Sequence, residues 1–237
     1  MKTITPLVFL ILLLSQTACN QRKKSSEKLN PNAVAEKSSE VITNEILKNG
    51  SSPYEDLIEF ALDKNNRKIT ATFNKIKAEK TNITGHLRLT KIEQFDTFFE
   101  RISNAVHDKN YNQIALNSAE TYKLIISSMR RRGLIVPKEV SYLDYVGFKL
   151  LVQLNDEEVA WNETYTTVYD AVIYWNIIKT DVKKNKGLHN LMNVIVDGLR
   201  DAQRTRNKEM LVFAAKVNLE AVDLLEEFYI KGPSAIK

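Results

Sequence analysis

The sequence has few of the residues that build common catalytic and nucleotide-binding sites. Its 237 residues include one cysteine, three histidines and seven glycines. The glycines form no Gly-x-Gly-x-x-Gly run and no phosphate-binding loop, and no histidine has the Glu-x-x-His spacing of carboxylate-bridged metal bundles. The motifs Gly-x-Ser-x-Gly, His-Glu-x-x-His and Cys-x-x-Cys-His are also missing. The sequence therefore favours a non-enzymatic protein without a cofactor.

Long apolar runs and proline are scarce as well. The apolar run Pro6 to Leu14 is far shorter than the stretch of about 20 residues that crosses a bilayer. A single cysteine, Cys19, leaves no partner in the chain for a disulfide. After Pro53 the only prolines are Pro137 and Pro233, so long segments have no residue that would interrupt a helix.

The first 18 residues have the order of a secretory signal. Lys2 precedes the short apolar run, and the small or polar residues Ser15 to Ala18 follow it. A positive residue, a short apolar core and a small-residue exit are the parts of a cleaved signal peptide. We therefore expect residues 1–18 to be removed and to take no part in the fold.

The stretch "LLLSQTACN", residues 12–20, places Cys19 directly after this segment. It resembles a bacterial lipoprotein signal, although Gln16 stands where such signals usually carry leucine. The resemblance covers only about the first twenty residues and implies that Cys19 is lipidated, bears palmitate and becomes the mature N-terminus. Asn20 in the next position implies delivery to the outer membrane of the cell envelope. The alternative is an ordinary signal, or a short uncleaved anchor, with an unmodified cysteine.

Residues 19–52 are rich in Ser, Asn, Lys and Glu and almost lack aromatic side chains. Such a composition buries too little apolar surface to offset the entropy lost on ordering, so it predicts a flexible tether. The basic cluster Arg22, Lys23 and Lys24 next to a lipidated cysteine can contact anionic headgroups, or it can simply be solvated.

Residues 53–232 are predicted to form one helical domain. Their apolar residues recur at helical spacing, and no run alternates as a half-buried strand would. Three such stripes are Ile58, Leu62, Ile69, Phe73 and Ile76; Ile92, Phe95, Phe99, Ile102 and Val106; and Tyr111, Ile114, Ala115, Ala119, Tyr122, Ile126 and Met129. The sequence thus predicts an all-α fold, an antiparallel multi-helix bundle or a short helical array, with about five to seven helices after a disordered tether.

Two features bear on how the helices are paired. Residues 138–183 keep one apolar phase, which fits either a single long helix or a hairpin that turns at Asn155-Asp156; average helix length and turn chemistry favour the hairpin. The segments beginning at His107 and Asn207 align without gaps and share Ala, Glu and Leu at equivalent positions. Either they are copies of a helical unit in an antiparallel arrangement, or two amphipathic helices have converged.

Two sets of residues are candidate sites. Glu157, Glu158, Trp161 and Tyr165 place carboxylates beside aromatic rings and could line a pocket for a cation or a sugar, or they could belong to the core and its rim. His189 and Met192 stand three residues apart near a helix start and could offer imidazole and thioether to a soft metal. The alternative is a surface histidine beside a core methionine.

The charge pattern gives no case for nucleic acid. The net charge is +5 with a pI near 9.1. Arg200 and Arg204 alternate with Asp197 and Asp201, a pattern typical of solvated ion pairs. The sequence therefore favours an envelope-anchored lipoprotein that contacts the membrane through its lipid and uses a non-enzymatic helical domain for protein–protein interaction or as a structural adaptor. The alternative is a periplasmic helical bundle that binds a small ligand or a metal.

Overall fold

The computed structural model describes the backbone of residues 31–232 and the side chains of residues 39–232. This part of the chain contains eight helices and no strand, so the all-α prediction is confirmed, with more helices than the expected five to seven. They are α1 (Pro31–Leu62), α2 (Asn66–His86), α3 (Leu89–Asp108), α4 (Tyr111–Ser128), α5 (Lys138–Leu154), α6 (Trp161–Val182), α7 (Lys186–Arg204) and α8 (Lys208–Lys231). The predicted signal peptide and Cys19 lie outside the described residues.

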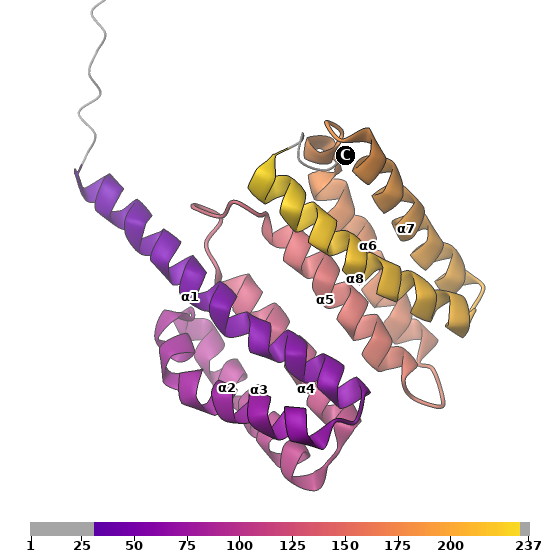
Figure 1. Cartoon of the computed structure of the whole chain (residues 1–237), viewed down its shortest axis with the longest axis horizontal. Coiled ribbons are helices and arrows are strands. Elements are labelled where there is room, and N and C mark those ends of the chain that lie inside the picture. Colours follow the sequence, from indigo (N-terminus) through magenta and orange to yellow (C-terminus); the bar gives the residue numbers. More distant parts are fainter. Residues whose placement is uncertain (1–30, 233–237) are drawn as a thin grey trace, which may run out of the picture.

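The eight helices form two four-helix bundles that lie side by side (Figure 1). In the first, α1 packs against α2 and α4, and α3 packs against α4. In the second, α5 packs against α6 and α8, and α7 packs against the same two helices. The bundles meet mainly where α4 contacts α5. Every helix contributes buried apolar side chains to the core.

Three of the helical hairpins turn in the same way. In each turn a basic residue adopts a left-handed conformation, and the asparagine after it caps the next helix through its side-chain oxygen. The backbone N–H of that asparagine donates to the carbonyl oxygen five residues earlier, which closes the preceding helix. These pairs are Lys64-Asn65, Lys109-Asn110 and Arg206-Asn207.

The hairpin alternative for residues 138–183 is confirmed. Helix α5 ends at Leu154 and α6 begins at Trp161, with the turn between them. Asp156 fixes this turn to neighbouring elements, because its side chain accepts a hydrogen bond from Asn112 (2.8 Å) and its carbonyl oxygen accepts one from Lys208 (2.8 Å). The two halves of this segment therefore pack as antiparallel neighbours.

The two segments that align in sequence occupy equivalent places in the two bundles. The first includes α4 and the second includes α8, and each is the last helix of its bundle and packs against the first. Ala115 and Ala215, which the alignment equates, are both fully buried. The sequence similarity thus coincides with a repeated four-helix arrangement.

The start of the helical domain needs a correction. The predicted boundary at Pro53 is too late, because α1 begins at Pro31 and contains Pro53 in its interior. Leu47 is fully buried, and the buried Asn44 donates to the carbonyl oxygens of Arg130 and Arg132 and accepts from the N–H of Arg130. The polar composition of this segment predicted disorder. The segment is nevertheless helical, because its few apolar residues and one asparagine side chain contact the rest of the domain.

Candidate binding groove between the two bundles

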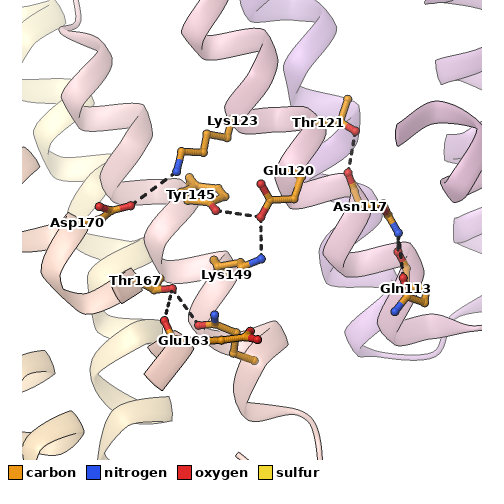
Figure 2. A network of polar contacts seen from close by, with 11 residues as sticks. Gln113, Asn117, Glu120, Thr121, Lys123, Tyr145, Lys149, Glu163, Thr167 and Asp170 are labelled. Atoms are coloured by element: carbon orange, nitrogen blue, oxygen red, sulfur yellow. Dashed lines mark hydrogen bonds and ion pairs between the residues drawn. The ribbon is translucent and has the colours of Figure 1, made fainter. Parts of the chain in front are cut away.

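Polar contacts join the bundles along α4, α5 and α6 (Figure 2). Glu120 of α4 accepts hydrogen bonds from the Tyr145 hydroxyl (3.0 Å) and from the Lys149 ammonium (2.6 Å) of α5. Lys123 of α4 forms an ion pair with Asp170 of α6 at 3.6 Å. Because these contacts come from two helices of the second bundle, they fix its position relative to α4.

Close packing inside the second bundle holds α5 and α8 together beside this joint. A Cβ atom on Gly147 of α5 would lie 2.5 Å from the Leu219 side chain of α8, so a larger residue there would require Leu219 to move. The Asn218 side chain donates to the carbonyl oxygen of Leu143 at 2.7 Å. Helices α5 and α8 therefore present one continuous wall toward the first bundle.

A groove runs between this wall and α1. It consists of two adjoining cavities of about 320 and 420 Å³, both of which include Glu59 and Lys216 in their linings. Along α1 the lining passes from Glu55 to Leu62, and along α5 from Asp144 to Leu154. Along α8 the lining passes in the opposite direction, from Asp223 to Val212, so α8 runs antiparallel to the other two helices.

The lining of this groove is strongly acidic. Its carboxylates come from all three helices and from the turn after α1, and are Glu55, Asp56, Glu59, Asp63, Asp144, Glu220 and Asp223. Within the described residues, Lys216 is the one cation in the lining. Carboxylates gathered between low-dielectric walls focus a negative potential, which attracts cationic partners.

Two of these carboxyl groups are held away from water beside Tyr122 of α4. Burial is the main cause that raises the pKa of Glu55 to about 7, and the charge of Glu226 raises it further, while a hydrogen bond with Tyr122 opposes the rise. Burial and then the nearby Glu55 raise the pKa of Asp144 well above its ordinary value. The Tyr122 hydroxyl donates to Asp144 Oδ2 at 3.1 Å. Burial and neighbouring carboxylates therefore make the ionised form of both groups unfavourable, and a bound cation would stabilise that form.

An ion pair marks one end of the groove, and an apolar cavity lies beyond it. Lys48 of α1 and Glu226 of α8 lie 3.5 Å apart and bridge the groove beyond Glu55. On the other side of this bridge is a cavity of about 280 Å³, whose lining includes the exposed side chains of Ile135 and Ile230. An occupant of the whole groove would thus meet carboxylates first and aliphatic side chains at one end.

The structure separates the residues of the predicted ligand pocket. Glu157 and Glu158 are exposed in the turn before α6, and Trp161 is half-buried at the start of that helix, where its carbonyl oxygen accepts a hydrogen bond from Gln203. Tyr165 lines a different cavity, between α6 and α7, together with Tyr169. The two glutamates and Trp161 are not in the lining of that cavity.

The two predicted metal ligands lie in different surroundings. Met192 is fully buried in the apolar core, whereas His189 is half-buried at its edge. The His189 ring lies 5.7 Å from the Trp175 ring, and Asn193 connects the two by accepting from the indole N–H and approaching His189 Nδ1. Within residues 39–232, no group of three or more His, Cys, Asp or Glu side chains is arranged to hold a metal ion.

Sequence reasoning missed the groove, although a signal was present. Four of its carboxylates fall within residues 55–63, and four acidic residues of α8 fall within 220–227, with no lysine or arginine in either segment. Acidic residues on amphipathic helices usually alternate with cations three or four positions away. The two acidic segments without lysine or arginine therefore indicated acidic helix surfaces. They did not indicate that these surfaces lie opposite each other.

Comparisons with known proteins add no identity. No family model matches the chain, and neither the curated proteins nor the solved structures include a significant match. In the part of the chain from residue 31 to 232, none of the helices has both the length and the apolar character to cross a membrane. The fold and the groove thus define a helical double bundle with an acidic groove between its two halves.

Proposed function

We propose that this protein is an envelope-anchored lipoprotein whose non-enzymatic helical domain binds a cationic helical segment of a partner protein. The observation that carries the binding proposal is the acidic groove between α1 and the α5–α8 wall, with Lys216 as the single cation in its described lining. The resemblance of residues 12–20 to a lipoprotein signal supports the anchor.

The shape and side chains of the groove favour a helix as its occupant. The acidic segment that runs from Glu55 of α1 to Asp63, directly after that helix, extends over roughly 12 Å, or about two helical turns. Half-buried aliphatic residues, Leu151, Val212 and Leu219, lie among the carboxylates. A helix with lysine or arginine on one face and leucine beside them matches both features, since amphipathic helices bind grooves through residues at spacings of three and four.

The experiment uses a synthetic helical peptide with alternating lysine and leucine faces, titrated into the mature chain carrying Cys19→Ala. Fluorescence anisotropy should give a dissociation constant in the micromolar range, about −8 kcal/mol. Raising the salt concentration should weaken binding, because the attraction is between charges. A peptide with glutamate in place of lysine should not bind.

A set of neutralised variants tests the location. Glu59→Gln, Glu220→Gln and Asp223→Asn together remove three exposed carboxylates of the groove, and should weaken peptide binding by about tenfold or more. The matched control is Glu157→Gln, Glu158→Gln and Glu209→Gln, which removes the same charge from exposed positions outside the groove. Equal weakening by the two sets would show that net charge, and not the groove, attracts the peptide.

A further inference from the structure

A second cavity lies within the C-terminal bundle, between α6 and α7. Its volume is about 410 Å³, which is in the range of small-molecule sites. Tyr165 and Tyr169 line it from α6, and Arg200 and Arg204 line it from α7. None of these four residues lines the acidic groove, so the two surfaces are separate.

The two tyrosine rings are parallel to each other and open to solvent. Their ring centroids are 6.3 Å apart with an angle of 12° between the ring planes, and their side chains are 58% and 54% exposed. The buried Val168 lies in the same lining. Aromatic rings that are left exposed and parallel offer apolar area to a flat body.

The two arginines stand one helical turn apart on α7 and belong to the same lining. Each makes one contact of 3.2 Å with an aspartate three residues earlier, Arg200 with Asp197 and Arg204 with Asp201. All four side chains of these pairs are more than 60% exposed, and such pairs contribute little energy. Asp201 also lines the cavity, which leaves two cations and one carboxylate there.

We propose that this cavity binds a small organic anion with a flat, apolar body. A guanidinium carries five N–H donors, so each arginine keeps donors for a carboxylate, phosphate or sulfonate while it contacts its aspartate. The exposed tyrosine rings contact the body of the ligand. The excess of one positive charge in this lining favours an anion over the cation that the Glu157 and Glu158 pattern suggested.

The probes are 2-naphthoate, its neutral analogue 2-naphthamide, and acetate, each titrated into the mature chain by calorimetry. Naphthoate should bind with a dissociation constant of about 0.1 to 1 mM. The amide lacks the charge and acetate lacks the body, so each should bind at least about tenfold more weakly. Equal binding of naphthoate and naphthamide would overturn the proposal. So would the absence of naphthoate binding at about 10 mM, a concentration above the weakest dissociation constant expected.

Variants locate the binding. Arg200→Gln with Arg204→Gln should weaken naphthoate binding by about tenfold, and Tyr165→Ala with Tyr169→Ala should weaken it by a similar factor. The control is Lys186→Gln, which removes an exposed cation of α7 outside the cavity and should leave binding unchanged. These side chains are exposed, so the melting midpoint should stay constant and report that each variant is folded.

One further arm distinguishes a soluble anion from a lipid headgroup. Vesicles of phosphatidylglycerol should bind the Cys19→Ala chain equally with and without the Arg200 and Arg204 substitutions. If they bind only the chain with both arginines, and naphthoate does not compete, the surface recognises a membrane and the small-ligand proposal is wrong.

Discussion

Glu55 shows how a single residue reports on the groove. Its carboxyl group is half-buried beside Tyr122 and faces Asp56, Asp144 and Glu226, with Lys48 as the nearby cation that favours its charge. Burial raises its pKa from 4.5 to about 7. The folded protein therefore keeps this proton to a higher pH than the unfolded chain does, and the free energy of unfolding falls as the pH rises between these two values.

This difference predicts how stability changes with pH. The contribution of Glu55 is complete below about pH 4.5 and is lost as the pH rises through about 7. Glu55→Gln should flatten that part of the curve and stabilise the protein at pH 8 by on the order of 1 kcal/mol, allowing for its partial exposure. Thermal melting from pH 4.5 to 8.5 measures this.

The control is Asp197→Asn, an exposed residue of α7 outside the groove, which should leave the pH profile unchanged. A Glu55→Gln protein with the same slope as the parent would mean that the pKa of Glu55 does not differ between the folded and the unfolded chain. Asp144 and Glu59, whose pKa values are also raised, would then be the groups to replace next.

At the scale of elements, α1 shows that a segment of polar composition can be an ordered helix. Its N-terminal half is polar, yet the fully buried Leu47 and the three hydrogen bonds of Asn44 attach it to the core and to the loop before α5. The interior Pro53 removes one backbone hydrogen bond without ending the helix. Tertiary contacts thus order a segment whose own propensity is weak.

A pair of truncations tests the contribution of this half of α1. A chain that begins at Ser39 should melt like the mature protein, because it keeps Asn44 and Leu47. A chain that begins at Pro53 loses both, and should be destabilised by about 3 kcal/mol or more, given the cost of a deleted core leucine and of unpaired buried groups. Thermal melting followed by circular dichroism measures this; equal midpoints would restore the boundary at Pro53.

At the scale of the whole molecule, the proposed lipid at Cys19 would place both binding surfaces near a membrane. The anchor rests on the sequence "LLLSQTACN" alone. Cys19→Ala should move the protein from the membrane fraction to the soluble envelope fraction, and the mature chain should lose the mass of its acyl groups. Unchanged partition and unchanged mass would exclude lipidation and leave the groove proposal as it stands.

The sequence alone determined the fold class, because helical spacing of apolar residues is a local property that each segment carries by itself. The sequence favoured the hairpin at Asn155 over a single long helix, which the structure decided, and it contained the similarity between the segments that include α4 and α8. Their repeated glutamates illustrate the limit: Glu120 is paired with Tyr145 and Lys149, whereas Glu220 lines the open groove. Residues at equivalent positions of the two segments have different roles, because their spatial neighbours come from different helices.

Only the tertiary structure decided which surfaces face each other. The carboxylates of the groove come from α1, α5 and α8, which are far apart in the chain, so their mutual repulsion appears only after the bundles pack. In the same way, Tyr165 lies beside Arg200 and Arg204 because α6 and α7 fold back on each other, and not beside Glu157. Charge and burial at a site are sums over spatial neighbours, and helix packing chooses those neighbours.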